Sequence, residues 1–120
     1  MRILVIDDQE KARASMAAVL EAAGHEVILA DGGQAGLREL KRSHLDVVIT
    51  EVLMPETDGI EVVKAARAKQ QDLWIVTTSG GGRHLSANAA LAIARAFGVD
   101  RILYKPFRKE DLLEAIARDT

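Results

Sequence analysis

Residues 47–55 read VVITEVLMP, an apolar run that stops at Glu51 and resumes directly after it. A strand that ends in this way holds a carboxylate at its C-terminal end. Residues 3–8 repeat the arrangement, because the run ILVI stops at Asp7 and Asp8. The carboxyl ends of parallel strands lie along one edge of a sheet, so we expect three carboxylates to converge there. Three converging carboxylates indicate a metal ion, and Mg²⁺ suits oxygen ligands of this kind.

The composition predicts one domain over residues 1–120, long enough to bury a single core of ordinary size. The 16 basic and 18 acidic side chains give a formal net charge of -2, which provides no general attraction to nucleic acid or to an anionic membrane. The chain has no cysteine, which excludes disulfides, thiolate metal sites and cysteine nucleophiles.

The sequence shows no signal-type segment before the first apolar run and no stretch near the roughly 18 apolar residues of a membrane span. We therefore expect a cytoplasmic location. The length fits either a single-domain protein or a fragment of a longer one.

Five short apolar runs predict strands buried on both faces, and helical segments separate them. Strict alternation of this kind predicts an α/β fold with a parallel sheet and helices on both faces. The predicted strands are residues 3–6, 26–30, 46–50, 73–78 and 101–104. The predicted helices are residues 10–22, 33–42, 59–69, 86–97 and 108–118.

The functional site of a doubly wound sheet lies outside the carboxyl ends of its strands, so the exit residues carry the functional hypothesis. The first strand exits at Asp7 and Asp8, and the third exits at Glu51. The fourth exits at Ser79 and the fifth at Lys105. A hydroxyl and an ammonium beside a bound cation could hold the oxygens of a transferred phosphoryl group.

These features resemble the receiver domain of bacterial two-component response regulators, over essentially all 120 residues. The resemblance implies a flavodoxin-like fold, a doubly wound five-stranded parallel sheet with strand order 2-1-3-4-5. The motifs occur in the family's order and approximate spacing: Asp7-Asp8, Met54-Pro55 to Asp58-Gly59, Ser79-Gly80 and Lys105-Pro106-Phe107.

In that family a sensor histidine kinase donates a phosphoryl group to an aspartate at the end of the third strand. The resemblance implies Mg²⁺ held by Asp7, Asp8 and Glu51, with Ser79 as the switch hydroxyl and Lys105 as the phosphoryl-binding lysine. It implies a sensor histidine kinase or phosphotransfer protein and a downstream protein target as partners. We expect a signalling domain rather than an enzyme.

The resemblance places Glu51 at the position of the family's phosphoacceptor aspartate. The glutamate carboxylate lies one methylene further out, about 1.5 Å. A misplacement of about 1 Å can cost about 100-fold in rate. We therefore expect impaired phosphorylation, with Glu51 pairing with Lys105 or accepting a hydrogen bond from Ser79. Its single charge would imitate only part of a phosphoryl group, which carries nearly two.

Two other functional classes fit parts of this pattern. A degenerate receiver, held in one state by Glu51, would act as a phosphorylation-independent protein-binding module. A metal-dependent phosphatase or small hydrolase would need a substrate pocket, and the compact chain shows no cap insertion. The run SGGGR at residues 79–83 lacks the ending of a Walker motif, so we do not assign it to nucleotide binding.

Each candidate residue also has a purely structural explanation. Asp7-Asp8 could cap the following helix, Glu51 could be a solvated loop carboxylate, and Lys105 could lie on the surface. Thr77 or Thr78 would replace Ser79 as the exit hydroxyl if the strand register were shifted.

The fourth predicted helix is rich in alanine over residues 87–97, and small side chains permit close approach of another helix. Homodimerisation or kinase docking through the last two βα units is our hypothesis for its role.

Overall fold

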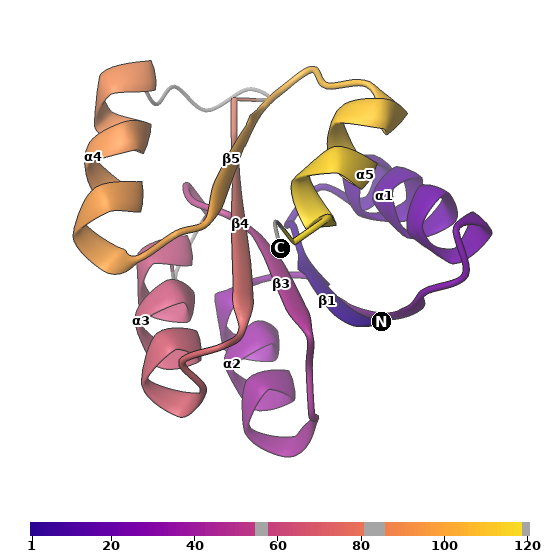
Figure 1. Cartoon of the computed structure of the whole chain (residues 1–120), viewed down its shortest axis with the longest axis horizontal. Helices are drawn as coiled ribbons and strands as arrows, with labels where there is room; N and C mark the ends of the chain where they lie inside the picture. Colours follow the sequence, from indigo (N-terminus) through magenta and orange to yellow (C-terminus); the bar gives the residue numbers. More distant parts are fainter. Residues whose placement is uncertain (55–57, 81–85, 119–120) are drawn as a thin grey trace.

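The computed structural model describes residues 1–54, 58–80 and 86–118, and within them five strands alternate with five helices (Figure 1). Pro55 and residues 81–83 of the glycine-rich run lie outside the described residues. The elements in chain order are β1 (Arg2–Ile6), α1 (Glu10–Ala22), β2 (Glu26–Ala30), α2 (Gly33–Arg42), β3 (Val47–Glu51), α3 (Gly59–Lys69), β4 (Trp74–Ser79), α4 (Ala87–Phe97), β5 (Arg101–Tyr104) and α5 (Lys109–Ile116).

The five strands form one parallel sheet in the order β2-β1-β3-β4-β5, which confirms the predicted fold class and strand order. The predicted element boundaries are close to the observed ones. The largest difference is in the last helix, which was predicted over residues 108–118 and ends at Ile116.

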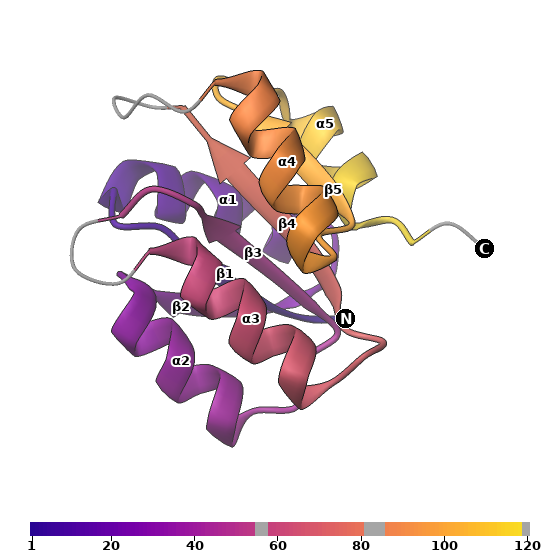
Figure 2. The ribbon, with the colours of Figure 1, turned by 90° about the vertical axis from the view of Figure 1, so that its left-hand side faces the viewer.

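Helices cover both faces of the sheet (Figure 1). The helices α1 and α5 lie on one face, and α2, α3 and α4 lie on the other, where α2 and α3 run side by side (Figure 2). None of the helices in the described ranges is both long and apolar enough to cross a membrane.

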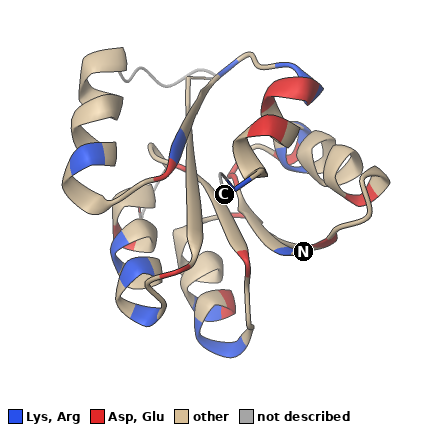
Figure 3. Cartoon of the chain, viewed as in Figure 1, with Lys and Arg blue, Asp and Glu red and all other residues tan. Residues whose placement is uncertain are grey.

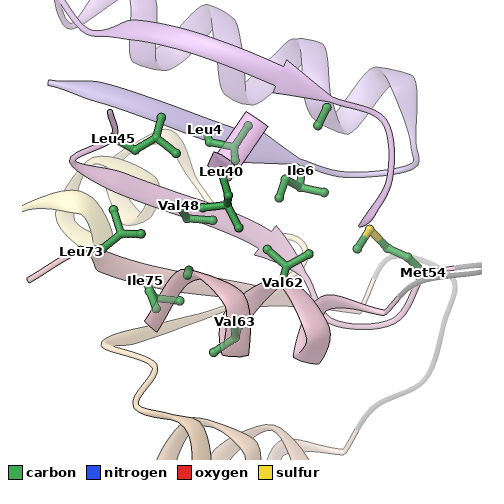
Figure 4. Close-up of a cluster of buried hydrophobic side chains, with 12 residues drawn as sticks. Leu4, Ile6, Leu40, Leu45, Val48, Met54, Val62, Val63, Leu73 and Ile75 are labelled. Carbon is green, nitrogen blue, oxygen red and sulfur yellow. The ribbon is translucent and has the colours of Figure 1, made fainter. Parts of the chain in front are cut away.

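Two hydrophobic cores fill the space between the sheet and its two helical layers, because side chains alternate faces along each strand. Figure 4 shows the core beneath α2 and α3, where Leu4 and Val48 from the sheet meet Val62 from α3. The second core, beneath α1 and α5, contains Ile49 and Val76.

The edge strands β2 and β5 are only partly buried, so the prediction that all five strands are buried on both faces is wrong for these two. Leu29 of β2 is 46% exposed and Tyr104 of β5 is 47% exposed. An edge strand has a neighbour on one side, and the helical layers end near it.

Charged residues are distributed unevenly along the helices (Figure 3). The last turn of α2 contains Lys41 and Arg42, and the last turn of α3 contains Arg67 and Lys69. Cations at helix C-termini interact favourably with the helix dipole. These basic side chains therefore lie at the end of the sheet opposite to the predicted carboxylate cluster.

Candidate functional site

Three carboxylates meet at the carboxyl edge of the sheet. Asp7 follows β1, Asp8 follows Asp7, and Glu51 is the last residue of β3. One carboxylate oxygen from each residue lies within 4.8 Å of the others. Asp7 is fully buried, Glu51 is 2% exposed, and Asp8 is half-buried. The structure thus brings together the three residues that the sequence placed at neighbouring strand ends, and Glu51 is not a solvated loop carboxylate.

Lys105 bridges two of these carboxylates. Its Nζ donates to Asp7 Oδ2 at 2.8 Å and to Glu51 Oε2 at 2.5 Å. The lysine side chain is only 10% exposed, so a surface role is wrong. Hydrogen bonds between charged groups are shorter and stronger than neutral ones. A single ammonium therefore balances two buried acids in this structure.

The protonation of the bridge is set by burial and by its partners. Burial raises the pKa of Glu51 to about 7, the hydrogen bond from Lys105 works to lower it, and the neighbouring charge of Asp7 raises it. Burial alone would lower the pKa of Lys105, but its hydrogen bonds to Asp7 and Glu51 raise it above the usual value. Lys105 is therefore charged, and Glu51 changes charge near neutral pH.

Backbone and side-chain contacts fix Asp7 in place. Its Oδ1 accepts a hydrogen bond from the backbone N–H of Gln9 at 2.8 Å, and its own N–H donates to the carbonyl of Ala30 at 3.2 Å. Arg13 of α1 donates to the Asp7 carbonyl at 2.8 Å. The N-cap of α1 is Gln9, so neither Asp7 nor Asp8 is the capping residue. The hydrogen bond from Arg13 to the Asp7 carbonyl was not predicted, because nothing in the sequence of the first helix indicates where the Arg13 side chain points.

The turn after β3 holds the backbone of Glu51. Asp58 is the N-cap of α3 and accepts hydrogen bonds from two N–H groups of its first turn. The next residue, Gly59, donates its N–H to the Val52 carbonyl at 2.8 Å. A Cβ on Gly59 would lie 2.1 Å from the Glu51 carbonyl oxygen. The sequence indicated a turn at Asp58-Gly59, but it did not indicate that the glycine lies directly against the candidate acceptor residue.

The exit of β4 contributes buried hydroxyls. Ser79 is the last residue of this strand and is 4% exposed, and Thr78 is fully buried. The hydroxyls of both residues have no hydrogen-bond partner in the part of the chain that the structure describes. The backbone carbonyl of Ser79 accepts a hydrogen bond from the N–H of Lys105 at 2.8 Å, which links the ends of β4 and β5. Ser79 is therefore the last residue of β4, whereas the strand register sets Thr78 beside Glu51.

The donor set of this edge fits a small divalent cation. Carboxylate oxygens are the ligands that Mg²⁺ prefers, and Asp7, Asp8 and Glu51 offer three of them. Buried hydroxyls without partners mark the same edge as a place for a polar ligand.

A groove on the outer side of β5 lies over the last two βα units. It encloses about 360 Å³ and includes the exposed side chains Leu91 and Tyr104, which are 40% and 47% exposed. This is the surface where the sequence predicted homodimerisation or docking of a kinase.

Comparison with known proteins identifies relatives of the whole chain. Residues 3–117 match the family model of the response regulator receiver domain. Over 116 residues the chain is 34% identical to the response regulator MprA of Mycobacterium leprae. That alignment covers 97% of this chain and 49% of MprA, so the chain spans about half the length of this relative.

Two solved structures show the same fold over nearly the whole chain. The chemotaxis protein CheY4 of Vibrio cholerae is 30% identical, with a TM-score of 0.85, and the match covers 96% of this chain and 94% of that one. A response regulator from Burkholderia pseudomallei, solved with a phosphorylated aspartic acid, a calcium ion and citrate, is 25% identical with a TM-score of 0.85. That match covers 97% of this chain and 66% of the other.

Proposed function

Since the chain belongs to the response regulator receiver domain family, we propose that its carboxylate cluster is a Mg²⁺-dependent receiver site in which Glu51 occupies the phosphoacceptor position. The domain belongs to two-component signalling. Its proposed partners are a sensor histidine kinase or phosphotransfer protein and a downstream protein target. Its own role is regulatory binding rather than turnover of a substrate.

The contact between Lys105 and Glu51 carries this proposal. Lys105 is the residue that the family resemblance assigns to the phosphoryl group, and here it meets the Glu51 carboxylate at 2.5 Å. The glutamate therefore already presents a negative oxygen to the lysine. One carboxylate charge supplies part of the nearly two charges of a phosphoryl group. We infer a site that is partly set toward its phosphorylated arrangement.

The same geometry argues against efficient phosphoryl transfer to Glu51. The nucleophilic oxygen lies about 1.5 Å further along its side chain than an aspartate oxygen would. The hydrogen bond from Lys105 withdraws charge from this oxygen, and the raised pKa of Glu51 leaves part of the carboxyl protonated, and so not nucleophilic, at neutral pH. A bound Mg²⁺ would neutralise the carboxylates and the oxygens of a transferred group. The Burkholderia relative was solved with a phosphorylated aspartic acid, so the acceptor in that protein is a carboxylate.

Intact-mass spectrometry tests the proposal. The chain and its Glu51→Asp variant are incubated separately with Mg²⁺ and a small phosphodonor such as acetyl phosphate. We expect the variant to gain one phosphoryl group and the parent chain to gain little or none. The phosphodonor loses its phosphoryl group to the carboxylate oxygen, and an acyl phosphate forms.

Two controls make the result specific. Omitting Mg²⁺ should abolish the gain, and adding Asp8→Asn to the Glu51→Asp variant should reduce it strongly. Equal phosphorylation of the parent chain would contradict impaired acceptance at Glu51. If neither chain gained mass, the assignment of a receiver site to this edge would be wrong.

A further inference from the structure

The strand β2 forms an open edge of the sheet, away from the proposed site. It lies between α1 and α2 and pairs only with β1 (Figure 2). Its residues read EVILA, and Leu29 among them is 46% exposed. Proteins usually block such edges with charges, proline or a bulge, because an open edge pairs with other chains. The strand β2 has neither proline nor bulge, and its one charge, on Glu26, is already paired with Arg2 of β1 at 2.9 Å.

The hydrogen bonds to β1 show which backbone groups of β2 face outward. At one end of the strand, the N–H of Glu26 donates to the carbonyl of Met1 at 2.9 Å. At the other end, the carbonyl of Ala30 accepts from the N–H of Asp7 at 3.2 Å. Backbone groups alternate sides along a strand. The first, third and fifth residues of β2 therefore face β1, and the second and fourth face outward.

The outward-facing residues are Val27 and Leu29. No backbone partner for their N–H and C=O groups lies within residues 1–54, 58–80 and 86–118. In an antiparallel pair, two residues that face each other through such groups exchange two hydrogen bonds. If Val27 of one copy stands opposite Leu29 of a second copy, the symmetric pair forms as well. This pairing is centred on Ile28 and matches every residue of β2 with a residue of the other β2.

The apolar side chains of β2 are complementary to one another in this register. Val27 packs against the core beneath α1 and α5, and Leu29 lies on the same face of the strand. Their pairing therefore brings two apolar side chains together and covers the exposed Leu29. Ile28 lies on the other face, against the core beneath α2 and α3, and meets Ile28 of the second copy. Apolar contacts thus form on both faces of the joined sheet.

The polar residues fit the same register. Glu26 stands opposite Ala30, so the like charges of the two copies are kept apart. One position beyond the strand, the ring of His25, which can donate a hydrogen bond, stands opposite the exposed carboxylate of Asp31. A shift of the register by two residues in either direction would leave only three of the five residues of β2 paired.

We propose that the outer edge of β2 is a self-association surface, through which two copies of this chain pair their β2 strands antiparallel about a two-fold axis and form one continuous sheet. A two-fold contact of this kind is closed, because each copy covers the edge of the other. The interface is one short strand from each copy, so the association is weak and reversible. The groove beside β5 lies at the opposite edge of the sheet and stays open for a partner protein.

Sedimentation velocity of the whole chain tests the association. We expect the parent chain to pass from monomer to dimer over about 10–100 μM. Leu29→Lys puts a charge on the edge and should weaken the dimer at least about tenfold, while its circular dichroism stays that of the parent chain because Leu29 is exposed. Leu91→Lys, at a leucine of α4 that is 40% exposed, is the matched control and should dimerise as the parent chain does.

Three results of this experiment would overturn the proposal. The first is a parent chain that stays monomeric over the whole concentration range. The second is undiminished dimerisation of Leu29→Lys. The third is a dimer that Leu91→Lys abolishes and Leu29→Lys does not, because the contact would then lie on the last two βα units.

Single-cysteine variants test the register, because the chain has no cysteine of its own. The two Ile28 residues form a non-hydrogen-bonded pair with Cα atoms about 4.5 Å apart, which a disulfide spans. The two Leu29 residues are offset along the strands and lie about 9 Å apart, beyond the reach of a disulfide. With diamide as the oxidant, Ile28→Cys should therefore form a disulfide-linked dimer several-fold faster than Leu29→Cys.

This order of rates is the reverse of the order of exposure. Random collisions would favour a cysteine at position 29, since Leu29 is exposed and Ile28 is half-buried. Equal rates, or faster cross-linking of Leu29→Cys, would overturn the proposed pairing. The unfolding midpoints of the reduced variants show whether both chains are folded, and the sedimentation of Leu29→Lys tests the same edge without a change at Ile28.

Discussion

Replacement of Lys105 by methionine should destabilise the domain in a way that depends on pH. The change keeps a side chain of similar length and removes the ammonium that bridges Asp7 and Glu51. Two buried carboxylates, 0% and 2% exposed, then face each other without a cation. Breaking a buried pair by removing one partner leaves an uncompensated charge, which costs more than an exposed pair contributes.

The expected magnitude follows from the charge state of Glu51. In the parent chain the carboxylate is mostly ionised near pH 8, because its pKa is about 7; in Lys105→Met, which loses the hydrogen bond that lowers this pKa, the carboxylate must either stay ionised without its partner or take up a proton. Removing one partner of a buried pair costs about 3 kcal/mol at the lower end of the usual range. Near pH 5 Glu51 is protonated and the repulsion from Asp7 is relieved. The loss should then be smaller, because Lys105 is missing from one buried carboxylate, that of Asp7, instead of from two ionised ones.

Urea unfolding in EDTA measures this difference, with the fluorescence of Trp74, the single tryptophan, as the signal. Lys41→Met, at an exposed lysine in the last turn of α2, is the control and should change the free energy of unfolding little at either pH. Adding Mg²⁺ near pH 8 should recover much of the loss, because the cation replaces the missing charge. A loss that is equal at both pH values, or that Mg²⁺ leaves unchanged, would refute this account of the bridge.

Three further predictions concern single residues of the same edge. The pKa of Glu51 is about 7 in the folded chain, against 4.5 for the free side chain. Protonation of Glu51 therefore stabilises the fold below pH 4.5, and this contribution is lost as the pH rises through 7. The unfolding midpoint in EDTA, measured relative to that of Glu51→Gln, should decline over this pH range, and a constant difference between the two chains would contradict the raised pKa. Gly59→Ala places a Cβ 2.1 Å from the Glu51 carbonyl oxygen and should cost about 2 kcal/mol in urea unfolding, whereas Gly32→Ala, where an added Cβ meets nothing within 4 Å, should cost much less. Ser79→Ala, introduced into Glu51→Asp, should leave the unfolding midpoint unchanged and slow the gain of a phosphoryl group; an unchanged rate would remove Ser79 from the site.

Hydrophobic pattern was sufficient to predict the elements and the edge of the sheet that carries the site. Apolar runs that end at acidic residues predicted β1 and β3, and the strict alternation of strands with helices predicted a parallel sheet. Because parallel strands end at one edge, the meeting of Asp7 and Glu51 followed from the strand ends alone. Burial of the edge strands did not follow, since an apolar run does not show whether a strand has one neighbour or two.

Contacts between distant residues could not be predicted from the sequence. Lys105 is 98 positions from Asp7 and 54 from Glu51, and its placement at a strand exit did not show that one ammonium would bridge both. The sequence left Thr77, Thr78 and Ser79 open as exit hydroxyls. The structure separates two of these roles, because Ser79 ends β4 and Thr78 is the residue that stands beside Glu51.

In our proposal a working receiver site surrounds a blocked acceptor, and a competition between two chains in one tube tests this under identical conditions. Equal amounts of the parent chain and Glu51→Asp, which differ in mass by one methylene, are mixed with Mg²⁺ and limiting acetyl phosphate. Intact-mass spectrometry then reports the phosphorylated fraction of each chain. The account predicts phosphorylation of Glu51→Asp with little or none on the parent chain. Equal phosphorylation of both chains, or none on either, would contradict it.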